Sequence, residues 1–139
     1  MNKSCVIQSS TLAAVVGVLF SLNAMAEPNM SHDAYKAEKS RIESEYKVDK
    51  ARCDSLAGNA EDICEAEVKG KKEVAEADLE ARYKPSKENR YKTRIAKAEA
   101  DYKVAKERCD DLSGNAKEVC LKEAKAAEAA AKADAKKES

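Results

Sequence analysis

The chain has 139 residues, and its 26 basic and 26 acidic side chains give a formal net charge of zero. This balance argues against a nucleic-acid-binding protein, which would present a strongly basic face to phosphates. Aromatic residues make up only 4% of the sequence and tryptophan is absent, so the composition excludes a thick globular core and favours long, charged helices with a narrow apolar seam.

Residues 1–26 predict a cleaved secretory signal peptide. Lys3 supplies the positive charge, residues 12–22 form an apolar run, and residues 24–26 (Ala-Met-Ala) are small enough for a signal peptidase site. The apolar run has about half the roughly 20 residues that span a bilayer, which favours cleavage over an anchor. We therefore expect a periplasmic or secreted mature chain that begins at Glu27 and has no transmembrane anchor.

Removal of this segment leaves an even number of cysteines and few aliphatic residues. Of the five cysteines in the sequence, the four that follow the signal peptide form an even set, as expected for two disulfides in an exported protein. Only twelve Leu, Ile and Val residues remain, so the mature chain needs a covalent constraint besides its small apolar core.

The mature sequence predicts helices, because Ala, Glu and Lys are strong helix formers and no alternating β-branched run is present. Ser31 is a suitable N-cap for the first helix, and Pro85 ends the second. The predicted helices span about 31–57, 60–83, 87–113 and 116–137.

One segment is repeated at an interval of 56 residues. CDSLAGNAEDIC, residues 53–64, recurs as CDDLSGNAKEVC, residues 109–120. A repeat of this kind indicates one structural unit used twice. We assign residues 27–84 to the first helical hairpin and residues 85–139 to the second.

The centre of each repeat has the residues of a turn between helices. Gly58 and Gly114 suit the left-handed position just past a helix end, and Asn59 and Asn115 suit the N-cap of the next helix. We therefore predict that the chain reverses at each Gly-Asn pair.

The cysteine spacing agrees with this reversal. In an unbroken helix residues 53 and 64 would lie about 16 Å apart, whereas a disulfide needs Cα atoms within about 7 Å. The pairs Cys53–Cys64 and Cys109–Cys120 are each centred on the predicted turn, so we predict two disulfide clasps, each stabilising its hairpin by about 3 kcal/mol. Cross-repeat pairing, 53 with 109 and 64 with 120, is the alternative. The predicted fold is all-α, with two tandem antiparallel hairpins.

A heptad pattern of apolar residues predicts the packing seam of these helices. In the second copy the steps from residue 91 to residue 112 alternate between 4 and 3, as in a coiled coil. The predicted seam residues are Tyr35, Ile42, Tyr46, Leu56, Tyr91, Ile95, Tyr102 and Leu112.

No pattern typical of catalysis is found in the sequence. His32 is the only histidine, so no second imidazole could share metal binding or proton transfer. Ten residues separate the cysteines of each pair, unlike the short spacings of zinc or thioredoxin-like sites. The sequence also lacks a nucleophile elbow and a phosphate-binding glycine loop. We expect no enzymatic activity, no cofactor and no metal.

Two resemblances add to these expectations. The stretch EAKAAEAAAKADAKK, residues 123–137, resembles in composition the helical spacer of TolA-type envelope proteins. The repeated Arg-Cys-Asp-x-Leu-x-Gly-Asn-Ala…Cys block, residues 52–64 and 108–120, resembles a class of small exported proteobacterial proteins rich in Ala, Lys and Glu. The second resemblance implies periplasmic residence and implies no mechanism.

Two functions agree with the sequence. The favoured one is a non-enzymatic periplasmic scaffold, spacer or adaptor that associates with a protein partner or with itself. The alternative is a reversible amphipathic binder of membrane surfaces or unfolded client proteins, which the neutral charge and the shortage of large aromatic residues disfavour.

Overall fold

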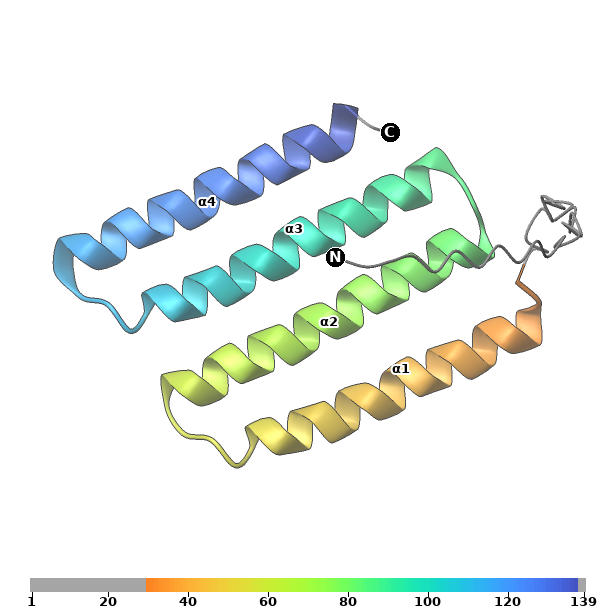
Figure 1. Ribbon diagram of the computed structural model, residues 1–139, viewed down its shortest axis with the longest axis horizontal. Helices are drawn as coiled ribbons and strands as arrows, with labels where there is room; N and C mark the ends of the chain where they lie inside the picture. The colour runs from red at the N-terminus through yellow and green to blue at the C-terminus, as the bar shows by residue number, and fades with distance from the viewer. Residues whose placement is uncertain (1–29, 138–139) are drawn as a thin grey trace, which may run out of the picture.

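Four antiparallel helices lie side by side in a single layer (Figure 1). The computed structural model describes residues 30–137, so the predicted signal peptide and the mature start at Glu27 lie outside the described residues. The helices are α1 (His32–Cys53), α2 (Asn59–Tyr83), α3 (Lys87–Cys109) and α4 (Gly114–Lys137). Within residues 30–137 there is no strand, and the predicted all-α fold of two tandem hairpins is confirmed.

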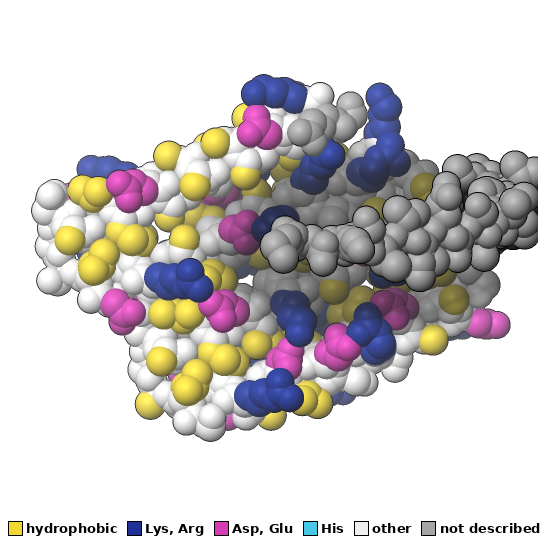
Figure 2. All heavy atoms as spheres, in the orientation of Figure 1, with side chains coloured by type: hydrophobic (Ala, Val, Ile, Leu, Met, Phe, Trp, Pro, Cys, Tyr) yellow, Lys and Arg dark blue, Asp and Glu magenta, His cyan; other side chains and the backbone are white. Residues whose placement is uncertain are grey.

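Each helix packs only against its neighbours in the sequence. Helix α1 contacts α2, α2 contacts α3, and α3 contacts α4. The two hairpins therefore pack side by side along α2 and α3, and no other helix of residues 30–137 covers either broad face of the layer. Basic and acidic side chains lie interspersed among hydrophobic ones on the part of one face visible in Figure 2. None of the helices described is both long and apolar enough to cross a membrane.

The core is restricted to the three lines along which adjacent helices meet. Ile42 and Leu79 are buried between α1 and α2, with 4% and 1% of their surface exposed. Alanines take the equivalent place between α3 and α4, where Ala98 and Ala135 are each 3% exposed. No charged or polar side chain is buried in the part of the chain that the structure describes. The layer therefore has a narrow line of buried side chains between each pair of adjacent helices and no single central core.

A serine side chain caps the first helix of each hairpin. Ser31 Oγ accepts a hydrogen bond from the backbone N–H of Ala34 at 3.1 Å, which confirms Ser31 as the N-cap of α1. Ser86 Oγ accepts the equivalent bond from Asn89 at 3.0 Å at the start of α3. Pro85 precedes this cap and separates the two hairpins, as predicted.

The turns differ from the sequence prediction in where the helices end. Helices α1 and α3 end at the cysteines, four residues before the predicted ends at 57 and 113. Gly58 and Gly114 do have positive φ angles, of 60° and 56°, but Gly58 is the N-cap of α2 and Gly114 opens α4. A left-handed glycine therefore starts the second helix and does not end the first.

Asn59 and Asn115 are accordingly not N-caps, because the N-cap position in the first turn belongs to Gly58 and the second helix already begins at Gly114. Glycine at the N-cap leaves the start of α2 with no side-chain cap hydrogen bond. Both asparagine side chains are therefore available for other contacts.

Both predicted disulfides are present. The Cα atoms of Cys53 and Cys64 are 5.5 Å apart, and those of Cys109 and Cys120 are 5.7 Å apart. Cys53 and Cys109 have no exposed surface. The cross-repeat alternative is wrong, and each clasp lies at the turn end of its own hairpin.

The predicted seam is only partly correct. Ile42 is buried, and Tyr35, Tyr46, Tyr91, Ile95 and Tyr102 are half-buried. Leu56 and Leu112 are each 43% exposed, so their assignment to the seam is wrong. The reason is the early end of α1 and α3, which places both leucines in the turns, beyond the last helical residue.

Candidate binding groove

Helices α2 and α3 approach each other closely where Gly70 meets Ala100. Both residues are buried, and a Cβ atom built on Gly70 would lie 2.8 Å from the Cβ atom of Ala100. Because both residues are small, the backbone of α2 at Gly70 packs directly against the methyl group of Ala100 on α3.

A groove of about 770 Å³ follows this contact along one face of the layer. Its floor consists of small and aliphatic side chains from both helices: Gly70, Val74, Ala75, Ala100, Val104 and Ala105. A shallow apolar channel between two helices is a common binding surface for the apolar stripe of a third helix.

The rim of the groove is charged but nearly balanced. Arg108 of α3 pairs with Glu67 of α2 at 2.7 Å, and Lys97 pairs with Asp101 at 2.9 Å. Exposed ion pairs of this kind contribute little stability. They instead give the groove a polar border without a dominant sign of charge.

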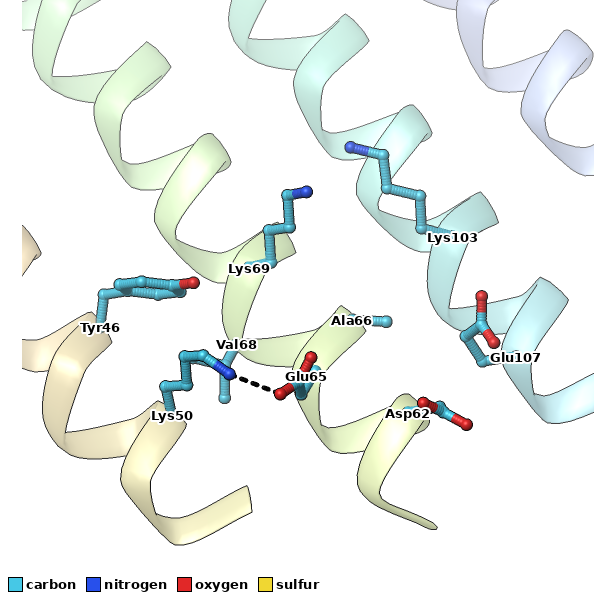
Figure 3. A pocket seen from close by; sticks show the side chains of 9 residues that line it. All are labelled: Tyr46, Lys50, Asp62, Glu65, Ala66, Val68, Lys69, Lys103 and Glu107. Atoms are coloured by element: carbon cyan, nitrogen blue, oxygen red, sulfur yellow. Dashed lines mark hydrogen bonds and ion pairs between the residues drawn. The ribbon is translucent and has the colours of Figure 1, made fainter. Parts of the chain in front are cut away.

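A second, smaller pocket of about 290 Å³ spans α1, α2 and α3 (Figure 3). Its α2 residue Glu65 lies about 200° around the helix from Glu67 at the groove rim, so the pocket is on the other face of the layer. Lys50 of α1 donates to Glu65, and this hydrogen bond raises the pKa of Lys50. A lysine held protonated in this way is a poor nucleophile or base.

An aromatic cluster joins α1 and α2 at the end opposite the clasp. The rings of Tyr35 and Tyr83 stack with centroids 4.4 Å apart, and the Tyr35 hydroxyl donates to Glu80 at 3.0 Å. This hydrogen bond to a carboxylate raises the pKa of Tyr35. His32 lies beside Tyr83, with 6.4 Å between ring centroids, so the only histidine belongs to this packing cluster.

Tyr83 was not predicted as a packing residue. The same symmetry that relates Cys53 to Cys64 about the turn relates Tyr35 to Tyr83, since the two residue numbers sum to 117 and 118 respectively. Extension of the cysteine symmetry along the hairpin would have identified this pair from the sequence.

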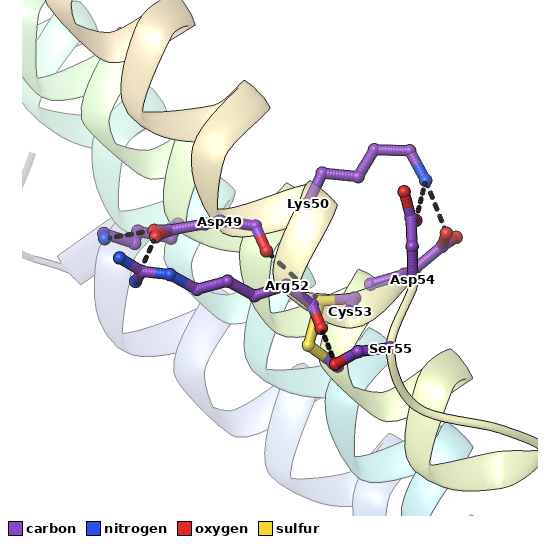
Figure 4. Close-up of a disulfide and its surroundings, with 9 residues drawn as sticks. Asp49, Lys50, Arg52, Cys53, Asp54 and Ser55 are labelled. Atoms are coloured by element: carbon purple, nitrogen blue, oxygen red, sulfur yellow. Dashed lines mark hydrogen bonds and ion pairs between the residues drawn. A yellow bond between two sulfur atoms is a disulfide. The ribbon is translucent and has the colours of Figure 1, made fainter.

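The clasp residues form their own polar network (Figure 4). Asp49 pairs with Arg52 at 3.1 Å, and the Ser55 hydroxyl donates to the carbonyl of Arg52 at 2.7 Å. Lys50 lies 3.9 Å from Asp54 in the turn. These contacts are local and leave the Leu56 side chain exposed.

Polar contacts connect the two hairpins across α2 and α3. Asn59 Nδ2 donates to the backbone carbonyl of Glu107 at 2.9 Å. Lys103 pairs with Glu73 and Arg108 pairs with Glu67, each at 2.7 Å. The asparagine predicted as a helix cap thus joins one hairpin to the other.

No group of three His, Cys, Asp or Glu side chains that could hold a metal ion is found among the described residues. The four predicted site cysteines are all in disulfides. No family model, no curated protein and no solved structure matches the chain. The resemblances to TolA-type spacers and to small exported proteins stay predictions.

Proposed function

We propose that the protein is a non-enzymatic helical scaffold or adaptor of the periplasm, which holds a partner protein on the open face of its helix layer. The observation that supports this proposal most directly is the groove between α2 and α3. It has an apolar floor, a balanced charged rim and a volume of about 770 Å³, on a layer whose faces no other part of residues 30–137 covers.

The periplasmic assignment rests on two kinds of support. Residues 1–26 have the pattern of a signal peptide, and both cysteine pairs of the hairpins are oxidised. Disulfides persist in oxidising compartments such as the bacterial periplasm.

The charged side chains support a binding role in preference to an acid–base role. Hydrogen bonds from Lys72 and Lys71 lower the pKa of Glu43 and Asp49, while the same bonds raise the pKa of the lysines. Both members of each pair are therefore held in their charged forms. General acid–base catalysis instead needs a group whose pKa lies close to the working pH.

The chemistry of the groove fits an amphipathic partner helix. Small floor residues such as Ala75 and Ala105, which are half-buried, leave room for larger aliphatic side chains of the partner. The paired rim charges would face the polar flanks of that helix. We therefore expect a partner whose binding segment has apolar residues at i, i+3, i+4 and i+7.

Site-specific photocrosslinking in living cells tests this proposal. A photoreactive residue at Val104, on the groove floor, should crosslink to one defined protein that mass spectrometry can identify. The matched control is a photoreactive residue at Ser113, exposed in a turn away from the groove. With the identified partner purified, Val104→Lys should weaken binding by tenfold or more, because it removes apolar area and adds an unpaired charge. Equal crosslinking at both positions, or unchanged affinity of Val104→Lys, would contradict a binding role of the groove.

Exposed leucines favour the alternative function as a second candidate. Leu56 and Leu112, each 43% exposed, lie at the two clasped turns, so one end of the layer presents apolar side chains. A binder of membrane surfaces or unfolded clients would use this end. Vesicle flotation at physiological salt tests it: the double variant Leu56→Ser with Leu112→Ser should then lose vesicle binding. Absence of binding by the unmodified protein would exclude the membrane form of this function.

A further inference from the structure

Helices α1 and α4 are the outermost helices of the layer, and each has one side that no helix of residues 30–137 covers. In sequence, these two free sides correspond to the sides of α3 and α2 that pack against each other and join the hairpins. Residues 56 positions apart relate α2 to α4 and α1 to α3. The side of α2 that packs on α3 therefore corresponds to the free side of α4, and the side of α3 that packs on α2 corresponds to the free side of α1. We call these the outer edge of α4, comprising Asn115, Val119, Lys122, Ala126, Ala129 and Ala133, and the outer edge of α1, comprising Ala37, Ser40, Ser44, Lys47, Val48 and Ala51.

Burial differs sharply between corresponding residues on α3 and α1. Ala100 is buried and Val104 is half-buried against α2, whereas Ser44 and Val48 at the corresponding positions of α1 are exposed. Val48, with 54% of its surface exposed, is the most exposed of the large hydrophobic side chains described. Its exposure would be explained if a helix packed on the outer edge of α1 as α2 packs on α3.

The same difference separates α2 from α4. Ile63 is half-buried and Gly70 is buried on α2, but Val119 and Ala126 on α4 are exposed. Val119 is 43% exposed. The two exposed valines outside the turns thus lie on the two outer edges, one on each.

Two of the three polar contacts described between the hairpins also have corresponding residues on the free sides of α1 and α4. Arg108–Glu67 corresponds to Arg52 on α1 and Glu123 on α4, and Glu123 forms no ion pair within residues 30–137. Within the described part of the chain, Arg52 pairs with Asp49 of its own helix. A second chain could therefore supply the Arg52–Glu123 pair.

The asparagine contact has an equivalent too. Asn59 donates to the backbone carbonyl of Glu107, and the corresponding groups are the Asn115 side chain and the carbonyl of Ala51. A backbone carbonyl is present whatever the side chain, so the groups that form this bond are conserved between the two places. The third contact, Lys103–Glu73, would be lost because Ala129 takes the place of Glu73.

We propose that a second copy of the chain docks its α4 outer edge against the α1 outer edge and thereby continues the helix layer. The contact is heterologous, since two different surfaces meet, and it leaves a free edge at each end of the assembly. Such contacts generate open-ended ribbons unless the rotation between copies closes a ring. This inference concerns the edges and not the groove, so its failure would leave the proposed adaptor function standing.

The intermolecular contact should be weaker than the one inside the chain. Ala126 and Ser44 would meet where Gly70 and Ala100 meet. Because a Cβ atom on Gly70 would lie 2.8 Å from the Cβ atom of Ala100, the extra methyl group of Ala126 and the hydroxyl of Ser44 require the two helices to lie further apart there. Loss of the third polar contact weakens it further. We expect association that depends on protein concentration, in place of an obligate oligomer.

Cysteine crosslinking tests the geometry. With the two native disulfides intact, Ser44→Cys and Ala126→Cys proteins should give a dimer under mild oxidation only when they are mixed, and a double variant should give a ladder of oligomers. The matched control replaces Ser44→Cys with Lys39→Cys, an exposed position about 140° around the same helix from Ser44. Dimers formed by Ser44→Cys alone would indicate an isologous contact and overturn the proposal.

Sedimentation analysis tests the association itself. Val48→Glu should raise the dissociation constant about tenfold, because it places a charge where the proposed interface would bury the valine. The matched control is Leu112→Glu, a similar change at an exposed residue in a turn, which should leave the dissociation constant unchanged. A monomer at all concentrations up to about 1 mM would overturn the proposal.

Charge exchange provides an independent measurement. Arg52→Glu and Glu123→Arg should each weaken association about twofold to fivefold, and the double variant should recover the original dissociation constant. No recovery in the double variant would contradict the predicted Arg52–Glu123 contact.

Discussion

Gly70 has the clearest structural role of any single residue. A glycine in a helix interior costs about 1 kcal/mol relative to alanine. This cost is offset by the close approach to Ala100, which no larger residue at position 70 would allow without movement of a helix. Gly70 therefore sets the distance between the two hairpins and the depth of the groove.

The first prediction follows from this contact. Gly70→Val should lower the free energy of unfolding by about 1–3 kcal/mol, because the new side chain overpacks the contact between α2 and α3. Urea unfolding followed by far-UV circular dichroism measures the effect. The matched control is Ala126→Val at the corresponding position of α4, where the side chain is exposed. In dilute protein this control should change stability by less than about 0.5 kcal/mol.

At the scale of the helices, each hairpin is held at its two ends by different means. The disulfide fixes the turn end, and the opposite end of the first hairpin is held by the Tyr35–Tyr83 stack. Between α3 and α4, alanines such as Ala98 and Ala135 form the contact. Alanine buries little apolar surface, so the second hairpin depends more on its clasp.

The second prediction compares the two clasps. Paired Cys→Ala changes at either clasp should cost about 3 kcal/mol of unfolding free energy. Loss of the Cys109–Cys120 clasp should also raise amide hydrogen exchange along α4, whereas loss of the Cys53–Cys64 clasp should leave α1 better protected by Ile42 and Tyr35. Hydrogen exchange with mass spectrometry measures the difference. Equal protection of α1 and α4 in the two variants would contradict it.

The helices and clasps could be predicted because their causes are local. Composition predicted the helices, and glycine position and cysteine spacing predicted the turns and both disulfides. The ends of α1 and α3 were wrong because a left-handed glycine can either end one helix or start the next, and the sequence does not distinguish these uses. The groove could not be predicted, because it depends on which sides of α2 and α3 meet. The repeat did offer a signal, since Gly70 has no glycine counterpart at position 126.

Across the whole molecule, surface ion pairs link adjacent helices of the layer. Lys72 of α2 pairs with Glu43 of α1 at 2.9 Å, and Lys132 of α4 pairs with Glu99 of α3 at 2.8 Å. Each acidic residue with a resolved shift among the described residues has a lowered pKa. A hydrogen bond from Arg41 lowers the pKa of Glu38 to about 2, the largest such shift.

The third prediction is a loss of stability in acid. A carboxyl group with a lower pKa in the folded state stabilises the fold above its unfolded pKa, and this contribution disappears as the pH falls through the folded value. The melting temperature should therefore be constant near neutral pH and fall between about pH 4.5 and pH 2. Thermal melts by circular dichroism measure it, and Glu38→Gln should show a shallower decline. A melting temperature that rises on acidification would contradict the prediction.

Each described helix packs only against helices next to it in the sequence, and this affects how the native disulfides can form. Four cysteines allow three pairings, and in the observed one each cysteine joins a partner 11 residues away. A chain that enters an oxidising compartment from its N-terminus can close Cys53–Cys64 before Cys109, 45 residues after Cys64, has arrived. Each new helix then packs against the helix that precedes it in the chain. The residues in contact are therefore separated by few positions in the sequence, which favours rapid folding. Vectorial export would thus select the native disulfides by order of arrival, without rearrangement by an isomerase.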